Sequence, residues 1–171
     1  MEIKTIPVGP LQANCYILIN NQTCLIIDPG DEYQKIINNI DKLKPLAILV
    51  THNHFDHIGA IKKLTNLYKI ETYDFSNMIE KKYSIESFQF EVIFTPGHSN
   101  DSVTYYFENI MFTGDFLFKG TIGRTDLTTG NMQAMETSIN KIKQYKHITI
   151  YPGHGEKTTL ALEKENNYYF K

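Results

Sequence analysis

The sequence predicts an α/β protein in which two packed, mixed β-sheets are flanked by helices, a four-layer αββα sandwich. Each half of the chain consists of strand-like segments followed by a helix with one apolar face, and such a helix must cover one face of a sheet. An apolar run in the first half has the character of a fully buried strand. A chain of 171 residues can form one domain with a substantial core, so we expect a single domain over residues 1–171.

The first half of the chain begins with strand-like segments at residues 2–8, 14–20 and 23–28. The short polar turn between the last two is typical of a hairpin. After a Pro-Gly break, Asp31 is expected to cap an amphipathic helix, and Pro45 is expected to end that helix. The apolar face of the helix is formed by Ile36, Ile37, Ile40 and Leu43.

A buried strand is expected at residues 46–50, and it leads directly into a polar cluster at residues 51–57. Apolar residues at helical spacing follow the cluster, so the cluster is predicted to be a loop between a strand and a helix. Loops held by rigid elements are where binding and catalytic sites are usually built. The apolar residues of the helix are Ile58, Ile61, Leu64 and Leu67.

The second half repeats this plan, with strands expected near residues 88–95, 103–107, 110–113 and 147–151. A short helix is expected from Lys157 onward to seal the core. The main helix of this half precedes the last strand, and its apolar face carries Met132, Met135, Ile139 and Ile142.

Composition and charge exclude several classes of partner. The net charge of -2 gives no basic surface for nucleic acid or for an anionic membrane. No apolar run approaches the length of a membrane span, and the first residues lack a signal-peptide core, so we expect a cytoplasmic protein. In that compartment Cys15 and Cys24 are expected to be buried, reduced thiols.

Histidine and aspartate residues are concentrated where strands end, which indicates a metal site. Neutral imidazole is a ligand of zinc and iron, and carboxylates supply the negative charge that holds two cations close together. His147 stands alone and is expected to be an ordinary solvated side chain. The seven candidate ligands are His52, His54, Asp56, His57, His98, Asp115 and His154.

The spacing within the 51–57 cluster has a geometric consequence. His52 and His54 lie two residues apart in an extended stretch and therefore point to the same side, whereas Asp56 and His57 can face a second point nearby. Three imidazoles and a carboxylate beside a buried strand would be costly without partners. One loop is therefore expected to serve two metal ions.

The segment 51–57, Thr-His-Asn-His-Phe-Asp-His, resembles the His-x-His-x-Asp-His signature of the metallo-β-lactamase superfamily. The segments 96–98, 113–115 and 152–154 are similar to the remaining ligand positions of that family, and the αββα sandwich is its fold. The resemblance implies two divalent metal ions, for which we expect zinc, with iron or manganese as alternatives. It implies His52, His54 and His98 as ligands of the first ion, Asp56, His57 and His154 as ligands of the second, and Asp115 as a bridge.

Residues 123–126, Gly-Arg-Thr-Asp, are similar to a loop of small glyoxalase II-like proteins and of persulfide dioxygenases. In glyoxalase II a basic residue at the position of Arg124 contacts glutathione, so Arg124 is a candidate substrate-binding residue. Bracing of Arg124 by Asp126 or Asp101 is an equally open alternative. The sequence departs from glyoxalase II at Asp126, where that enzyme has tyrosine, and the short segment after His154 cannot form its C-terminal glutathione-binding helical domain.

The resemblance implies a metal-dependent hydrolase of small thioesters such as S-lactoylglutathione. A hydroxide shared by the two ions, oriented by Asp56 and Asp115, would attack the thioester carbonyl. True β-lactamases of this fold commonly carry a non-bridging residue at the position of Asp115, so antibiotic hydrolysis is not expected. The alternative is a mononuclear iron persulfide dioxygenase using His52, His54 and Asp115 or an equivalent set of three ligands. A metal-binding protein without catalysis is the least favoured hypothesis.

Overall fold

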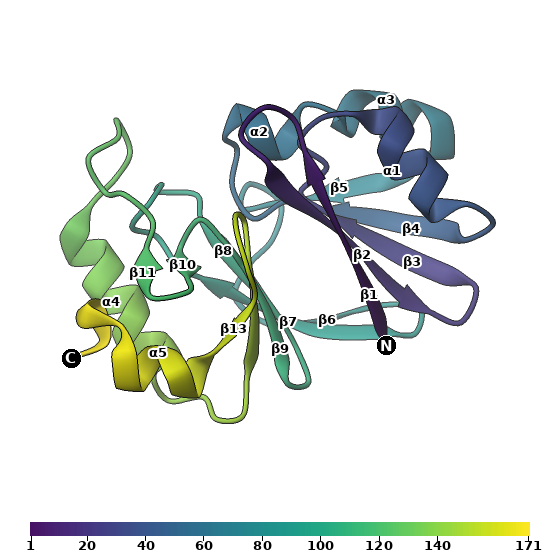
Figure 1. Ribbon diagram of the computed structural model, residues 1–171. Coiled ribbons are helices and arrows are strands. Elements are labelled where there is room, and N and C mark those ends of the chain that lie inside the picture. Colours follow the sequence, from purple (N-terminus) through teal and green to yellow (C-terminus); the bar gives the residue numbers. More distant parts are fainter.

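Two β-sheets pack face to face, and helices cover their outer faces, in the computed structural model, which describes residues 1–171 (Figure 1). This arrangement confirms the predicted αββα sandwich. In Figure 1 the helices α1 to α3 lie over one sheet, and α4 and α5 lie over the other. No helix combines the length and the apolar character needed to span a bilayer.

The N-terminal sheet contains five strands in the order β1-β2-β3-β4-β5. The first three are antiparallel, as the predicted hairpin requires, and β3, β4 and β5 are parallel, because helices connect them. The elements of this half are β1 Glu2–Val8, β2 Ala13–Asn20, β3 Thr23–Ile27, α1 Tyr33–Ile40, β4 Lys44–Leu49, α2 Phe55–Ile58, α3 Ile61–Tyr68 and β5 Glu71–Tyr73.

The C-terminal sheet contains six strands in the order β13-β12-β9-β8-β7-β6, and β12 is parallel to β9. A small hairpin, β10-β11, forms a separate two-stranded sheet and packs against the C-terminal sheet. The elements of this half are β6 Lys82–Ile85, β7 Phe88–Phe94, β8 Val103–Phe107, β9 Ile110–Gly114, β10 Leu117–Phe118, β11 Thr121–Ile122, α4 Met132–Ile142, β12 Thr149–Pro152, β13 Thr158–Thr159, α5 Leu160–Asn166 and the 3-10 helix η1 Tyr168–Phe170.

The boundaries of the first helix differ from the prediction. Asp31 does not cap it, because the Asp31 carboxylate accepts a hydrogen bond from the backbone N–H of its neighbour Glu32. The helix ends at Ile40, since Asp41 has a positive φ of 51° and a ψ of -114°, which are not helical values. Pro45 does not end a helix but lies within β4, next to a register shift in the pairing with β3.

Two further helix predictions need correction. The 51–57 cluster was expected to be a loop followed by one helix, but α2 already begins at Phe55 inside the cluster, and α3 follows as a second short helix. The helix expected from Lys157 begins only at Leu160, because Thr158 and Thr159 first pair with β12. The Thr159 hydroxyl then accepts from the backbone N–H of Leu162 and caps α5.

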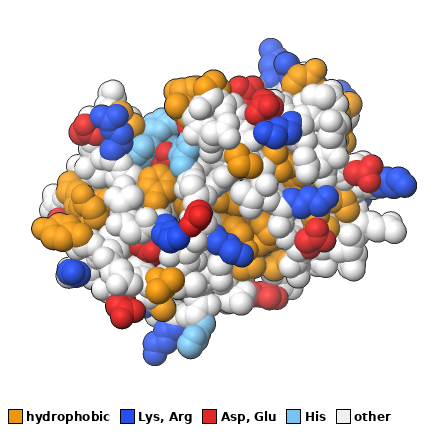
Figure 2. Space-filling view, viewed as in Figure 1, with side chains coloured by type: hydrophobic (Ala, Val, Ile, Leu, Met, Phe, Trp, Pro, Cys, Tyr) orange, Lys and Arg blue, Asp and Glu red, His pale blue; other side chains and the backbone are white.

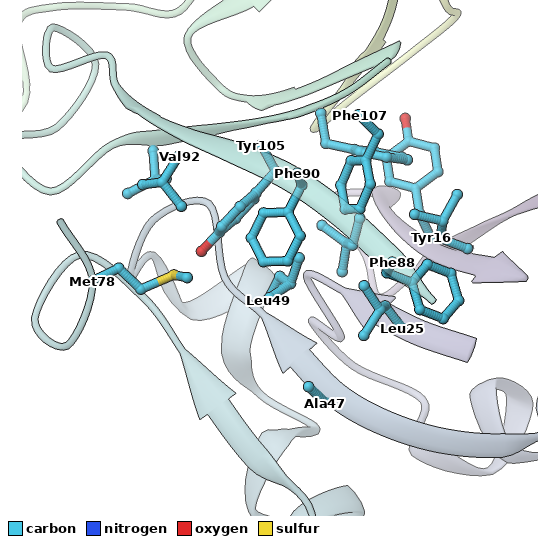
Figure 3. Close-up of a cluster of buried hydrophobic side chains, with 14 residues drawn as sticks. Tyr16, Leu25, Ala47, Leu49, Met78, Phe88, Phe90, Val92, Tyr105 and Phe107 are labelled. Atoms are coloured by element: carbon cyan, nitrogen blue, oxygen red, sulfur yellow. The ribbon is translucent and has the colours of Figure 1, made fainter. Parts of the chain in front are cut away.

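Three apolar clusters hold the layers together. The cluster between the sheets is rich in aromatic residues, and in Figure 3 Leu25 and Leu49 lie among Phe88, Phe90 and Tyr105. A second cluster packs α1 and α3 on the N-terminal sheet, and a third packs α4 and α5 on the other. The second cluster contains Cys15 and Cys24, which are buried free thiols, as expected.

Hydrogen bonds join the two sheets near the strand ends that carry the polar clusters. The Tyr105 hydroxyl, on β8, donates to the carbonyl oxygens of Val50 at 2.8 Å and Tyr73 at 3.1 Å. At the other side, the Tyr16 hydroxyl on β2 donates to the carbonyl of Pro152 at 2.6 Å. The bonds to Val50 and Pro152 are buried, and they fix the ends of β4 and β12 relative to the opposite sheet.

Candidate metal centre

All seven predicted ligands meet at one edge of the sandwich, where strands of both sheets end. Residues 52–57 follow β4, His98 follows β7, Asp115 follows β9 and His154 follows β12. Figure 2 shows histidine side chains in a hollow between the two halves of the molecule. Candidate ligands predicted at four separate strand ends therefore lie together in a single site.

The first group of side chains is His52, His54 and His98, whose ligand atoms lie within 4.8 Å of one another. The His54 Nδ1 atom lies 3.1 Å from Nε2 of His52 and 3.0 Å from Nε2 of His98. Burial is the main cause of the lowered pKa values of His52 and His54, and neighbouring histidines lower them further. Both rings are consequently neutral, as metal binding requires.

The second group is Asp56, His57 and His154, which also lie within 4.8 Å of one another. The carboxylate of Asp56 lies 3.2 Å from Nε2 of His154 and 3.6 Å from Nε2 of His57. Burial lowers the pKa of His57, but the adjacent Asp115 and Asp28 carboxylates outweigh it and raise the pKa to about 10. A cation bound here would replace the proton that His57 then carries.

Asp115 lies between the two groups. One carboxylate oxygen, Oδ2, is 3.6 Å from Nε2 of His98 in the first group and 3.6 Å from Nε2 of His154 in the second. The other oxygen, Oδ1, is 3.4 Å from Nε2 of His57. Although burial raises the pKa of Asp115, the imidazoles outweigh it and hold the pKa well below its usual range, so Asp115 is a carboxylate.

Hydrogen bonds behind the rings determine which nitrogen faces the centre. Nδ1 of His98 donates to the carbonyl oxygen of Arg124 at 2.9 Å, and Nδ1 of His154 donates to that of Leu11 at 3.0 Å. A carbonyl oxygen only accepts, so in the neutral rings the proton is on Nδ1 and Nε2 presents a lone pair to the centre. Such outer partners are typical of metal-ligating histidines.

Asp28 is a buried functional residue that the sequence analysis did not identify. Its carboxylate lies 3.0 Å from Nδ1 of His57 and accepts hydrogen bonds from the backbone N–H and the hydroxyl of Thr51 at 2.7 and 2.6 Å. It thereby fixes the ring of His57 and the first residue of the histidine loop. The sequence signal was its position at the end of β3, the same kind of position as the other site residues.

Two buried atoms at the centre have no hydrogen-bond partner, Nε2 of His57 and Oδ1 of Asp115. Unpaired buried polar atoms are costly, and the site brings these two 3.4 Å apart among further donor atoms. Gly153 permits this close packing, since a Cβ there would lie 2.2 Å from Oδ1 of Asp115. Cations at the centre would satisfy both atoms, so the donor set fits metal ions.

A cleft of about 510 Å³ opens onto these groups, and Arg124 lines it. The Arg124 guanidinium donates two hydrogen bonds to the Asp126 carboxylate, Nε to Oδ1 at 2.7 Å and Nη2 to Oδ2 at 2.9 Å. Asp101 instead accepts from Asn53, through its backbone and side-chain N–H groups. Asp126, and not Asp101, is therefore the residue that pairs with Arg124. His147 is exposed in the bend before β12 and belongs to none of the ligand groups, as expected.

Comparison with known proteins relates the whole chain to one family. Residues 8–74 and 84–154 match the family described as "Metallo-beta-lactamase superfamily". The chain is 38% identical to the Bacillus subtilis protein "Probable metallo-hydrolase YqgX", over 98% of this chain and 96% of the relative. It is 29% identical to the Haemophilus influenzae "Hydroxyacylglutathione hydrolase GloC", over 98% and 97% of the two chains.

Solved structures give the same result. A crystal structure of the "BLEG-1 B3 metallo-beta-lactamase" superimposes with a TM-score of 0.95 and 35% identity, over 99% of both chains. A structure of TTHA1623 "in a di-iron-bound form" superimposes with a TM-score of 0.90 and 30% identity, over 97% of this chain and 99% of the other. The chain belongs to the metallo-beta-lactamase superfamily.

Proposed function

We propose that this metallo-hydrolase cleaves small thioesters, with S-lactoylglutathione as the first substrate to test. The position of Asp115 carries the proposal, because its carboxylate contacts His98 of the first group and both imidazoles of the second. A carboxylate between two ligand groups balances the repulsion of two neighbouring cations. The donor set therefore fits two divalent ions, for which we expect zinc, with iron or manganese as alternatives.

The chain's own residues have separate roles in this proposal. Bound ions would supply Lewis acidity that makes water nucleophilic near neutral pH. Asp56 and Asp115, which both border the cleft, would accept hydrogen bonds from that water and orient it toward the thioester carbonyl. The carbon–oxygen bond forms, the carbon–sulfur bond breaks, and an acid and a thiol leave. His52, His54 and His98 would hold one ion, Asp56, His57 and His154 the other, and Asp115 both.

The relatives support hydrolysis but differ in their substrates. The name of the Haemophilus influenzae relative supports a glutathione thioester. The structural neighbour named as a B3 metallo-beta-lactamase supports a β-lactam amide as a second substrate class for the same nucleophile. We place the thioester first, because a thiolate leaves readily and Asp115 lies between both ligand groups.

The test is turnover under exclusion of oxygen. Protein purified without chelator is incubated anaerobically with S-lactoylglutathione, with S-acetyl-N-acetylcysteamine and with a β-lactam, and free thiol or opened ring is measured. We expect thiol release at the same rate with and without oxygen, because hydrolysis consumes only water. Glutathione persulfide is the control for the alternative reaction. Oxygen uptake with the persulfide, together with no anaerobic thiol release from the thioesters, would contradict the proposed hydrolase and indicate an iron dioxygenase.

A further inference from the structure

We propose that Asp101 is a positioning residue for the first metal ion, because its carboxylate holds the residue between His52 and His54 against the segment that carries His98. Asp101 itself belongs to none of the ligand groups. The inference rests on the two-ion centre of the proposed function and extends it to a residue outside the ligand set. It does not depend on which thioester is cleaved.

The contact between Asp101 and Asn53 is the first observation. One carboxylate oxygen, Oδ2, accepts from the backbone N–H of Asn53 at 3.1 Å and from its side-chain amide, Nδ2, at 2.8 Å. Residue 53 separates His52 from His54, so these bonds fix the backbone that carries both imidazoles. Asp101 follows His98 by three residues. The contact therefore joins the two chain segments that supply all three side chains of the first group.

Asp101 accepts these bonds as a carboxylate, which is the second observation. Its partial burial raises the pKa, but hydrogen bonds from Ser99 and Asn53 outweigh the effect of burial and lower the pKa of Asp101. Hydrogen bonds to a charged acceptor are shorter and stronger than those between neutral groups. The contact can therefore restrain the loop although the Asn53 side chain is exposed.

The turn that carries Asp101 is fixed by contacts of its own. The hydroxyl oxygens of Ser99 and Ser102, both buried, lie 2.7 Å apart and close the turn. The backbone N–H of Val103 donates to the carbonyl oxygen of Thr51 at 2.7 Å, directly before the histidine loop. Asp101 is thus held by a rigid turn, and it transfers that rigidity to the more exposed loop.

The second group depends on other contacts. The ring of His57 is held by the Asp28 carboxylate, and that of His154 by the carbonyl oxygen of Leu11. Neither contact involves Asp101. Ligands that are held in place before the metal arrives lose less conformational freedom when it binds. We therefore expect Asp101 to strengthen binding of the first ion and to leave the second ion unaffected.

Metal affinity in variants that retain only one ligand group tests the proposal. His154→Ala leaves the first group complete, and His54→Ala leaves the second group complete. Each background is titrated with zinc in competition with a chromophoric chelator. In the His154→Ala background, Asp101→Ala should weaken zinc binding about 3- to 10-fold, the range expected for one lost hydrogen bond. In the His54→Ala background the same change should leave the affinity within about twofold.

Two further variants separate the position of Asp101 from its charge. Asp101→Asn keeps an oxygen that can accept from Asn53 but removes the charge, so in the His154→Ala background it should retain the affinity within about twofold. A purely electrostatic attraction of the cation by Asp101 would weaken the asparagine and alanine variants equally. Asp74→Ala is the matched control, because Asp74 also accepts one backbone and one side-chain bond, both from Ser76. It should leave the zinc affinity unchanged.

Several outcomes would overturn the proposal. Equal weakening of zinc in both backgrounds would show that Asp101 supports the fold in general. An unchanged affinity in Asp101→Ala, an asparagine variant as weak as the alanine variant, or an equal loss in Asp74→Ala would each contradict the positioning role.

Asn53→Ala covers the case in which Asp101→Ala does not fold. It removes only the side-chain half of the contact and should give a smaller loss in the His154→Ala background alone; no loss there would contradict the proposal. Because zinc binding is measured directly, these outcomes do not depend on turnover. Absence of anaerobic thiol release would refute the proposed function and leave the comparison of zinc affinities intact.

Discussion

The carboxylate of Asp28 determines how His57 is presented to the centre, although the two residues belong to different segments. Asp28 is buried, and it accepts from Thr51 while it contacts Nδ1 of His57. A proton held on Nδ1 leaves Nε2 free to bind a cation. Its backbone is also unusual, with φ of 49°, a conformation that aspartate and asparagine tolerate better than other non-glycine residues.

Replacement of Asp28 by asparagine should weaken metal binding about 10- to 100-fold without unfolding the chain. The N–H₂ group of the introduced amide would donate toward Nδ1 of His57, so the ring proton would move to Nε2 and block the lone pair that faces the centre. Competition with a chromophoric chelator measures the affinity. Asp74→Asn is the matched control, because Asp74 follows β5 of the same sheet and its carboxylate bonds only to Ser76. Equal affinities in both variants would refute the role of Asp28.

The seven candidate ligands could be predicted from the sequence because three of the histidines and one aspartate crowd into one short loop. Asp28 was missed although it also stands at a strand end, since a single aspartate before Pro-Gly is typical of a turn, and only the folded structure shows its contact with His57. Arg124 was predicted at the cleft with two open roles. The sequence could not decide between substrate binding and bracing of the loop, because the answer depends on where the Arg124 side chain points. In the structure it bonds to Asp126.

At the scale of elements, the site depends on the close approach of the loop after β3 to the short helix α2. Gly30 makes this approach possible, because a Cβ at that position would lie 1.6 Å from the carbonyl oxygen of Asp56. The carbonyl oxygen of Gly30 in turn would lie 2.3 Å from a Cβ on Gly59. The backbone that carries Asp56 and His57 thus packs directly on residue 30.

Gly30→Ala should therefore lower the free energy of unfolding by about 3 kcal/mol or more, because a methyl group here must displace backbone rather than a flexible side chain. Metal content should fall with it. Gly120→Ala is the control, since nothing lies within 4 Å of its Cβ and only its φ of +78° is strained. That strain should cost about 1–2 kcal/mol. Thermal and urea unfolding of both variants measure the difference, and similar losses would contradict the packing argument.

The longer strands and the main helix of the second half could be predicted because their apolar residues recur over many positions. The strands β5, β10, β11 and β13 have only two or three residues each, too few to show a period. The end of α1 depends on the positive φ of Asp41, which could not be read from an apolar pattern that continues through Leu43. Pro45 is tolerated in β4 because the pairing with β3 shifts beside it.

At the scale of the whole molecule, the centre forms only when the two sheets are held in register. Tyr105 is one of the residues that join them, since its buried hydroxyl donates to the carbonyl oxygens of Val50 and Tyr73. Val50 precedes the histidine loop directly. The Tyr105 ring also belongs to the aromatic cluster between the sheets (Figure 3), so one side chain contributes to both packing and register.

Tyr105→Phe should cost about 1–3 kcal/mol of stability, because the Val50 carbonyl loses a buried donor while the ring still fills the core. The Tyr73 carbonyl keeps the backbone N–H of Val50 as a donor. Metal content at saturating metal should remain unchanged, since no ligand is altered. Tyr106→Phe is the control on the same strand, with its ring on the opposite face against Tyr145. Denaturant unfolding compares the two variants. If Tyr106→Phe lost as much stability as Tyr105→Phe, the loss would come from any such change on β8 and not from the hydrogen bonds of Tyr105.

The metal content of the protein purified without chelator tests the two-ion centre most directly. We predict two divalent ions per chain, because two groups of three side chains lie on either side of the Asp115 carboxylate. His54→Ala should lower the content to about one, since His54 belongs only to the first group. Asp115→Ala should lower the affinity for both ions. A fully active protein without metal would contradict the central claim.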